Sequence, residues 1–423
     1  MGRRVSQGGG LLAAGLAALL LAGCNAGVLK DLITELATLV YWREAATLDA
    51  GAALSATDWF GQGVAASGDD IVVGCPRDDP VSNAGSVHFF HWDGSQWQHQ
   101  TYDGTVASQR LGYSVAISGD YAIAGAPGVA TSVAGSARLF KRTAGVWALE
   151  KTLTPTGSPN TMLDEFGTSV AISGDYALVG APAGDAGVRG YAYVFYRNYV
   201  TPDSWGQQAQ LQASDGGGTD NFGTSVALSD PYAVAGAPGL ETAYLFERNV
   251  GSWGDGGLPS EESLQLTPSD GLAGDLFGTA VAVIQTHALV GAPVGDAAYL
   301  YTRDGSAWGS GTSPATESVK LVAEGGIAGD QFGSSVALAS GWAAAGAYKR
   351  DDSGADAGAV YMFAEAEGWE PFDELLPAGL AAGDQFGIST GLTPEWLVGG
   401  ANLDDSAVAD SGAAYVFALT QRK

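Results

Sequence analysis

The feature that most constrains this chain is a pair of short phrases that occurs seven times at a fixed internal spacing. The first phrase is Phe-Gly, then a small residue, serine and valine, as in Phe166 to Val170, and the second is Gly-Ala-Pro or a close variant, as in Gly180 to Pro182. The glycines of the two phrases are 13 residues apart in every copy, and successive copies begin 51 to 56 residues apart. A fixed period of this length indicates a repeat architecture. The paired glycines are Gly61 and Gly74, Gly112 and Gly125, Gly167 and Gly180, Gly223 and Gly236, Gly278 and Gly291, Gly333 and Gly346, and Gly387 and Gly400.

Each copy predicts four β-strands. Two short apolar runs flank a Ser-Gly-Asp turn between the phrases, as in residues 169–172 and 176–179, and this pattern is typical of a β-hairpin. A third run rich in Tyr and Phe follows, as in residues 191–196, and a fourth begins near a tryptophan, as in residues 147–153. Seven four-stranded antiparallel sheets are the pattern of an all-β, seven-bladed β-propeller, in which stacked blades bury both faces of every sheet.

The tryptophans predict how the ring closes. Each of the first six copies has a tryptophan at its fourth strand, but the seventh stops at Phe417 without one. Trp42 lies upstream of the first Phe-Gly phrase and supplies the missing residue. We therefore expect the N-terminal strand to complete the last blade, which removes two unpaired sheet edges. The propeller is expected to span residues 41–417, with a C-terminal tail at 418–423.

The N-terminus predicts export and lipid attachment. Arg3 and Arg4 precede an apolar run of about 11 residues, too short for a hydrocarbon core that needs about 20. Leu-Ala-Gly-Cys, ending at Cys24, resembles the bacterial lipobox, so residues 1–23 are expected to be a signal peptide, Cys24 the acylated residue and residues 24–40 a tether. Asn25 is not the aspartate that retains many lipoproteins at the inner membrane. The expected location is the cell envelope, at the outer membrane or cell surface.

The net charge and the cysteine content limit which molecules the chain can bind and which covalent links it can form. The formal net charge is −27, so the chain is expected to repel nucleic acid and anionic headgroups and to meet the membrane through its lipid. Acidity also keeps an exported protein soluble, which is the simpler interpretation. Cys75 is the only other cysteine. With Cys24 acylated, no internal disulfide can form, and Cys75 is expected to be a buried, unreactive thiol in a monomeric propeller.

The two phrases resemble the FG-GAP repeat family, which includes the head propeller of integrin α subunits. The resemblance covers about residues 41–417 and is strongest to bacterial members with a short Ser-Gly-Asp turn. Integrin-type repeats often carry an Asp-x-Asp-x-Asp-Gly calcium loop between the phrases. That insert is absent from all seven copies, so the integrin calcium sites cannot be transferred to this chain.

Acidic residues gather in the loops after the second strand of three copies. In a closed ring, blades six, seven and one are neighbours, and loops after the second and fourth strands share one face. We therefore predict a site for a ligand or a cation in this acidic sector. No cofactor is expected, and calcium is the candidate ion for such a site. The alternative is that these acids belong to solvated surface loops. The residues are Asp78, Asp79, Asp351, Asp352, Asp356, Asp404, Asp405 and Asp410.

Other polar residues have structural interpretations. An aspartate lies two residues before most Phe-Gly phrases and is expected to cap its own turn. The four histidines do not repeat between copies, and His88 and His91 are expected on an outer strand in surface or half-buried positions. On the opposite face, long connections between the third and fourth strands are expected at about residues 197–205, 248–262 and 303–317. Such loops can bind partners or be tolerated insertions.

Three functions remain open from the sequence. The first is an extracytoplasmic binding or adhesion module, not an enzyme, that presents propeller loops to a protein or glycan. The second is a structural part of an envelope assembly. The third is a polysaccharide-active enzyme with its site in the propeller channel, for which the chain carries no familiar catalytic motif.

Overall fold

The computed structural model describes residues 40–50, 54–78, 82–128, 133–156, 164–183, 189–249, 251–254 and 259–421. Residues 44–418 form one compact unit. The second unit comprises Met1–Arg43 and Leu419–Lys423, of which the described residues are the outer ends of the first and last strands. Within the described ranges, no helix has the length and apolar character needed to span a membrane.

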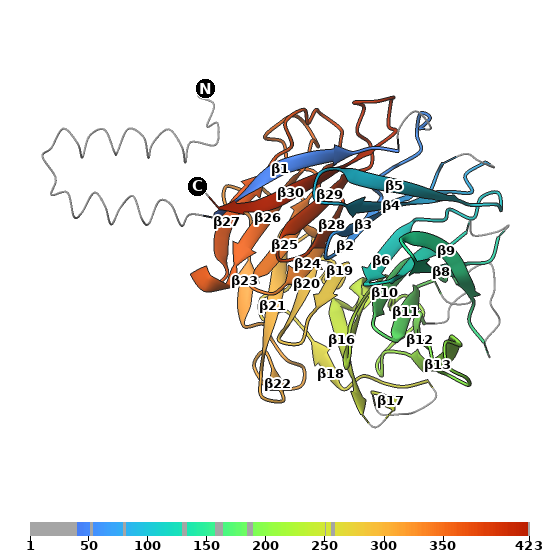
Figure 1. Ribbon diagram of the computed structural model, residues 1–423. Helices are drawn as coiled ribbons and strands as arrows, with labels where there is room; N and C mark the ends of the chain where they lie inside the picture. Colours follow the sequence, from blue (N-terminus) through green and yellow to red (C-terminus); the bar gives the residue numbers. More distant parts are fainter. Residues whose placement is uncertain are drawn as a thin grey trace, which may run out of the picture. The chain divides into compact units, whose positions relative to one another are not determined.

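Each repeat forms one antiparallel sheet, which confirms the all-β prediction (Figure 1). Four blades have four uninterrupted strands. They are β2 (Gly63–Ser67), β3 (Asp70–Cys75), β4 (Ser86–Trp92) and β5 (Trp97–Asp103); β6 (Ser114–Ser118), β7 (Tyr121–Ala126), β8 (Ser136–Thr143) and β9 (Val146–Leu153); β10 (Ser169–Ser173), β11 (Tyr176–Ala181), β12 (Tyr191–Tyr196) and β13 (Gly206–Leu211); and β24 (Phe332–Ala339), β25 (Trp342–Ala347), β26 (Ala359–Ala364) and β27 (Glu370–Leu375).

Blades four and five have a divided fourth strand. The strands are β14 (Ser225–Ser229), β15 (Tyr232–Ala237), β16 (Thr242–Asn249), β17 (Ser252–Trp253) and β18 (Leu264–Leu266); and β19 (Ala280–Val283), β20 (His287–Ala292), β21 (Ala297–Asp304), β22 (Ala307–Trp308) and β23 (Val319–Leu321). Two short 3-10 helices, η2 (Pro238–Leu240) and η3 (Glu365–Glu367), follow β15 and β26.

The seventh blade closes as predicted. It contains β28 (Ser389–Leu392), β29 (Trp396–Ala401) and β30 (Ala413–Gln421), and its fourth strand is the N-terminal β1 (Val40–Leu48), which pairs with β30 (Figure 1). Trp42 is 5% exposed on β1, the position expected for the missing tryptophan. The last strand continues through Gln421, into the segment expected to be a tail.

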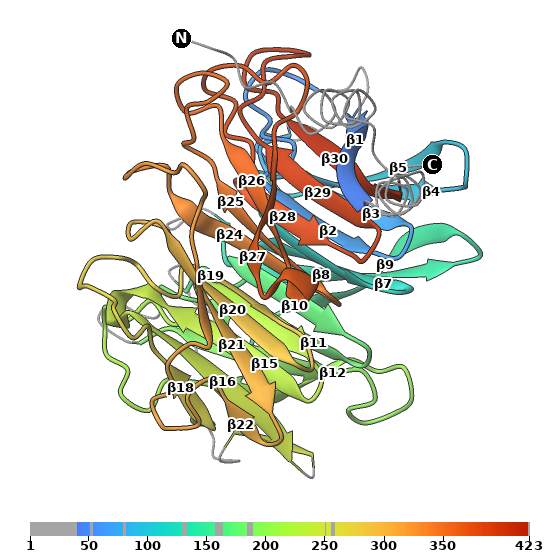
Figure 2. The same cartoon turned by 90° about the vertical axis from the view of Figure 1, so that its left-hand side faces the viewer.

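The first strands of the seven blades contact one another in a closed circle. Figure 2 shows part of this series, with β19, β24, β28 and β2 in succession. The same contacts continue from β2 through β6, β10 and β14 back to β19. The prediction of a seven-bladed propeller is confirmed.

The hairpin between the phrases also forms as expected. In blade three, β10 and β11 pair through Ser173 and Tyr176, which leaves Gly174 and Asp175 as a two-residue turn. Gly174 has φ +56°. Such turns require positive φ, which glycine adopts without strain.

The two glycine phrases join neighbouring blades. The Gly112 N–H donates to the Gly125 carbonyl at 3.0 Å within its own repeat. A Cβ on Gly125 would lie 2.0 Å from the carbonyl oxygen of Gly167 in the next repeat. The backbones of adjacent blades therefore meet at this point, which is why glycine recurs there.

The serine of the first phrase completes the joint. Ser114 donates through Oγ to the Gly167 carbonyl at 3.0 Å. The joint between blades seven and one has the same form, because Ser389 donates to the Gly61 carbonyl at 2.8 Å. Gly63 and Ala280 replace the serine in blades one and five.

The core lies between adjacent sheets. One cluster brings Leu178 and Val194 of blade three against Phe222, Tyr244 and Phe246 of blade four. The residue before the first-phrase glycine is fully buried in all seven blades, and Leu111 fills this position in blade two. These residues are Phe60, Leu111, Phe166, Phe222, Phe277, Phe332 and Phe386.

The long connections of blades four and five do not lie where they were expected. Asn249 already pairs with Ser252, so the fourth strand starts at β17, and the extra residues of the sequence fall between β17 and β18. Blade five repeats this arrangement between β22 and β23. Blade two has a β-bulge at the equivalent place, between Leu139 and Phe140. A bulge already breaks the ladder, and it is therefore a site that can accept extra residues.

Candidate functional site

The loops after the second strands of blades one, six and seven share one backbone frame. The carbonyl of the same loop position accepts an N–H from a glycine before the third strand in each blade. The bonds are Gly85 to Asp78 at 3.0 Å, Gly358 to Arg350 at 2.9 Å, and Gly412 to Asp404 at 3.1 Å. Asp78, Arg350 and Asp404 are therefore structurally equivalent, although their charges differ.

In blade six, this position holds a buried arginine surrounded by carboxylates. Arg350 is 7% exposed. Its guanidinium group lies 3.0 Å from Asp330, 2.9 Å from Asp352 and 3.3 Å from Glu374. Burial lowers the pKa of Arg350, but the Coulombic interaction with Tyr361, the hydrogen bond to Asp330 and the charges of Asp352 and Glu374 raise it overall. Asp352 is therefore already paired with a cation of its own loop.

In blade seven, Asp404 is 1% exposed and serves the loop itself. Its carboxylate accepts the Tyr415 hydroxyl at 2.5 Å and the Ser406 N–H at 2.8 Å. Burial raises the pKa of Asp384, and the nearby charges of Asp404 and Asp405 add to this rise. These three aspartates therefore gather at the joint that precedes Phe386.

The outer acids of both loops are exposed but have a structural task. Asp351 accepts the N–H of Asp356 at 2.9 Å. Asp405 accepts the N–H of Asp410 at 2.7 Å, in the same relationship five residues apart. Asp351, Asp352, Asp356 and Asp405 are exposed, and Asp410 is half-buried. The two loops thus expose acidic tips in which one carboxylate is hydrogen-bonded to its own loop.

The acidic loops are adjacent to the turns that precede the Phe-Gly phrases. Gly383 donates its N–H to the carbonyl of Ala355 in the blade-six loop at 2.9 Å. Thr57 does the same to Ala409 in the blade-seven loop at 3.1 Å. Loops after second and fourth strands therefore share one face, as expected. Asp79 and Cys24 lie outside the described residues.

The aspartates before the Phe-Gly phrases cap their own turns, as expected. In four blades, the carboxylate accepts the N–H of the residue three positions earlier. The pairs are Asp58 with Ser55 at 2.5 Å, Asp275 with Leu272 at 2.7 Å, Asp330 with Ile327 at 2.9 Å, and Asp384 with Ala381 at 2.6 Å.

Asp78 has different neighbours from the other acidic residues. Its carboxylate, the Cys75 thiol and the His88 ring lie within 4.8 Å of one another. In the part of the chain that the structure describes, this is the only group of three or more His, Cys, Asp or Glu side chains with metal-binding spacing. The predicted acids of blades six and seven thus do not converge on one metal position.

His88 is buried, whereas a surface or half-buried position was expected. It is 2% exposed on β4, and burial, together with the neighbouring His99, lowers its pKa to about 3. His91, three residues on, has a 49% exposed side chain and contacts Asp70. The burial of His88 could have been predicted by aligning the seven third strands. His88 occupies the position at which five other blades have tyrosine.

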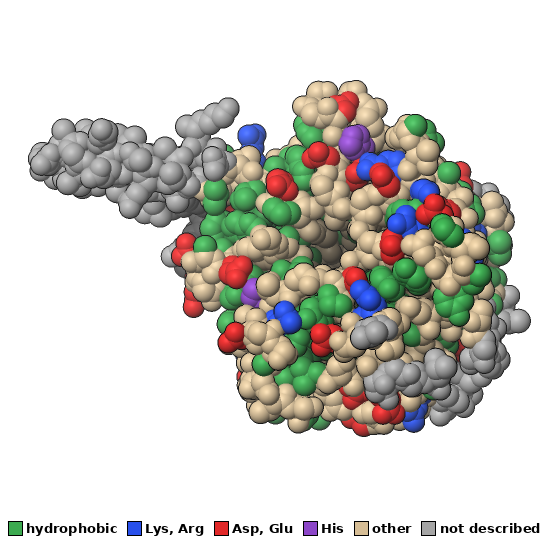
Figure 3. All heavy atoms as spheres, turned by 60° about the horizontal axis from the view of Figure 1, so that its bottom comes forward, with side chains coloured by type: hydrophobic (Ala, Val, Ile, Leu, Met, Phe, Trp, Pro, Cys, Tyr) green, Lys and Arg blue, Asp and Glu red, His purple; other side chains and the backbone are tan. Residues whose placement is uncertain are grey.

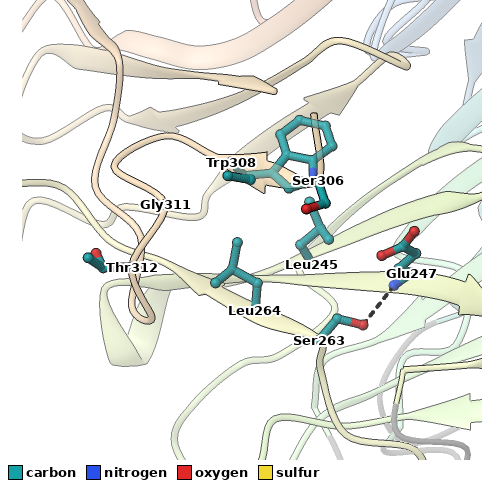
Figure 4. A pocket seen from close by; sticks show the side chains of 9 residues that line it. Leu245, Glu247, Ser263, Leu264, Ser306, Trp308, Gly311 and Thr312 are labelled. Atoms are coloured by element: carbon teal, nitrogen blue, oxygen red, sulfur yellow. Dashed lines mark hydrogen bonds between the residues drawn. The ribbon is translucent and has the colours of Figure 1, made fainter. Parts of the chain in front are cut away.

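Two openings lie on the outer edges of the blades. One of about 540 Å³ includes His99, Gln100, Arg142 and Trp147 of blades one and two in its lining. A smaller one of about 160 Å³ lies between blades four and five, where Leu245, Leu264 and Trp308 surround it (Figure 4). In Figure 4 the Ser263 hydroxyl accepts the backbone N–H of Glu247 at 3.0 Å.

Three tryptophans meet where blades one and seven adjoin. The ring centres of Trp92 and Trp97 are 5.5 Å apart, and Trp396 lies 6.1 and 5.5 Å from them. All three are half-buried. They come from hairpins on the face opposite the acidic loops. Figure 3 shows one face of the molecule, with a depression near its centre and acidic and basic side chains interspersed around it.

One family of known repeats matches most of the chain. The FG-GAP repeat matches residues 42–90, 147–195, 205–246, 261–309, 315–363 and 369–417. No curated protein matches the chain. Among solved structures, the chain is similar to a putative 6-phosphogluconolactonase from Bacteroides fragilis, with 12% identity and a TM-score of 0.49 over 82% of this chain and 89% of that one.

Proposed function

The chain belongs to the FG-GAP repeat family, and we propose that it is an extracytoplasmic, lipid-anchored binding module whose propeller loops hold a protein ligand. The observation that carries this proposal is the common frame of the loops in blades one, six and seven. One backbone geometry fixes Asp78, Arg350 and Asp404 at equivalent positions, and in blades six and seven it leaves the residues that follow, Asp351 and Asp405, exposed. A constant scaffold with variable loop side chains is how repeat proteins build recognition surfaces.

The acidic tips of blades six and seven favour a basic ligand surface. The carboxylates of Asp351 and Asp405 are held in place by bonds to their own loops. Their charge therefore faces the partner without further ordering, which lowers the entropic cost of binding. Anchoring at Cys24 would keep this surface outside the cytoplasm, at the outer membrane or cell surface.

The test is retention of a basic protein partner by the full-length chain. Asp351→Asn and Asp405→Asn together remove two charges but keep an oxygen that can cap each loop. We expect the association rate with a cationic partner captured from the cell envelope to fall several-fold and to lose salt dependence. Asp93→Asn is the matched control, because Asp93 is also exposed and caps its own turn through the Gln96 N–H at 2.9 Å. Equal binding by the double variant and the wild type would contradict the proposal.

A carbohydrate ligand is the second candidate, and the cluster of Trp92, Trp97 and Trp396 favours it. Half-buried tryptophans offer both an apolar ring face and an indole N–H, the combination that sugars contact. Trp97→Ala should abolish retention on a glycan array if this cluster binds sugar. Loss of glycan binding with unchanged protein binding would separate the two candidates.

A further inference from the structure

Blade one holds a group of three side chains whose chemistry differs from that of the acidic loops. Cys75 ends β3, Asp78 lies in the following loop, and His88 lies on the adjacent strand β4. Cys75 is fully buried, His88 is 2% exposed and Asp78 is half-buried. The sulfur, one carboxylate oxygen and one ring nitrogen lie within 4.8 Å of one another.

The same three positions in blade seven hold a different set. Ala401, Asp404 and Tyr415 are the equivalents of Cys75, Asp78 and His88. There the Tyr415 hydroxyl donates to Asp404 at 2.5 Å. Blade one keeps the aspartate and replaces the other two residues with a thiol and an imidazole.

Blades four and five also have a tyrosine at the position of His88, and its hydroxyl donates to a carboxylate. Tyr244 donates to Asp215 at 2.7 Å, and Tyr299 donates to Asp270 at 3.0 Å. Packing alone would be satisfied by tyrosine and alanine, as it is in these blades. Two replacements that meet in one blade, each introducing a metal-binding atom, therefore indicate a binding role rather than drift at one position.

The surroundings of His88 orient its ring for this role. Nε2 lies 2.8 Å from the Ser86 hydroxyl. Nδ1 lies 3.0 Å from Nε2 of His99 on β5. When Nδ1 donates its proton to His99, Nε2 keeps its lone pair, which faces the Ser86 hydroxyl in the absence of an ion. A hydrogen bond from the second ring nitrogen is characteristic of metal-binding histidines.

We propose that Cys75, Asp78 and His88 bind one divalent ion of the zinc class. Thiolate, imidazole and carboxylate are the usual ligands of zinc, and three protein ligands leave a fourth position for a water molecule or the Ser86 hydroxyl. Calcium is disfavoured because it requires six to eight oxygen ligands. On binding, the Cys75 thiol releases its proton to solvent, and its contact with the Asp58 carbonyl, 3.3 Å away, gives way to the metal bond.

Binding would fasten the loop after β3 to the third strand of its blade. Arg77 of this loop donates its N–H to the Asp58 carbonyl at 3.1 Å, and the turn that contains Asp58 is bonded to blade seven through Thr57 and Phe60. The ion would therefore stabilise the blade at which the ring closes. The inference is independent of the ligand proposed above.

The experiment is titration of the full-length chain with Co²⁺ and Zn²⁺, followed by absorption spectroscopy and calorimetry. We expect one equivalent of Co²⁺ to bind with a thiolate charge-transfer band, Zn²⁺ to displace it, and excess Ca²⁺ to leave it unchanged. Cys75→Ala and His88→Tyr restore the residues of blade seven and should each abolish the band. His99→Ala should weaken Co²⁺ binding by about 10–100-fold, because His99 is the hydrogen-bond partner that orients the metal-binding His88.

His91→Gln is the control, because His91 is an exposed histidine of the same strand and should bind Co²⁺ as the wild type does. Circular dichroism and the Tm in chelator check that each variant folds. Two results would overturn the proposal. One is the absence of saturable one-to-one binding by the wild type. The other is unchanged Co²⁺ binding in both Cys75→Ala and His88→Tyr. If one of these variants does not fold, unchanged binding in the other is sufficient to overturn the proposal.

Discussion

The hydroxyl of Ser389 donates a 2.8 Å hydrogen bond to the carbonyl of Gly61, 328 positions earlier in the chain. The same bond joins blades two and three through Ser114 and Gly167. The final joint of the ring is thus chemically equivalent to the internal ones. Closure uses the repeat's own motif rather than a special device.

Ser389→Ala should destabilise the closed ring modestly. The substitution leaves the Gly61 carbonyl without this donor, which costs about 1 kcal/mol of unfolding free energy. Urea denaturation measures the effect. Ser353→Ala, at an exposed loop position, should change stability by less than about 0.5 kcal/mol. Equal effects of the two substitutions would show that the joint does not depend on this bond.

Gly400→Ala should be far more damaging. A Cβ at Gly400 would lie 1.9 Å from the Gly61 oxygen, so blades seven and one would have to separate. We expect a loss of more than about 3 kcal/mol, measured by the same denaturation experiment. Gly68→Ala is the control, because φ is +57° there but nothing lies within 4 Å of the new methyl group. It should cost only about 1 kcal/mol of backbone strain, and a Gly400→Ala cost no larger than this would contradict the close approach.

Arg350→Met tests the buried charge cluster of blade six. Asp330 is 2% exposed and would lose its cation, which costs about 3–5 kcal/mol for a buried pair. The midpoint of urea unfolding should fall accordingly. Arg248→Met removes a half-exposed pair with Asp230 and should cost about 1 kcal/mol or less. A similar loss in both variants would mean that burial adds nothing to the Arg350 pair.

Asp373 should make stability fall as pH rises. Burial raises the pKa of its carboxyl to about 6, above its ordinary value of 3.8. Between these values the folded chain holds more protons than the unfolded chain, so the group's penalty grows from about pH 4 to pH 6 and is constant above. Asp373→Asn should therefore gain about 1 kcal/mol over the wild type at pH 7.5, after allowance for partial exposure, and less at pH 4.5. Denaturation at both pH values checks this, and a pH-independent difference would contradict it.

Calcium should leave the Tm of the full-length chain unchanged. Asp351 and Asp405 already cap their loops, and Asp352 is paired with Arg350. These carboxylates do not form one set of six to eight oxygen ligands. A scan in excess chelator and then in millimolar calcium tests this, and a rise of several degrees that Asp351→Asn abolishes would restore the calcium hypothesis.

The candidate site could be predicted only in part. The acidic loops were identifiable because ring closure makes blades six, seven and one neighbours. Which of their carboxylates remain available could not be predicted, because packing buries Arg350 beside Asp352 and two carboxylates outside the loop, Asp330 and Glu374. His88 was expected in a surface or half-buried position because a short strand's pattern does not show which face is covered.

The sequence by itself determined the number of blades, the hairpin turns and the use of β1 to close the ring. The hairpin turns follow from residues close together in the chain, whereas the number of blades and the ring closure follow from the fixed period and from the fourth strand that the last repeat lacks. Only the tertiary structure decided that Cys75, Asp78 and His88 meet while the acids of blades six and seven serve their own loops. The physical reason is that side-chain encounters depend on how the loops fold back and which faces the neighbouring blades cover.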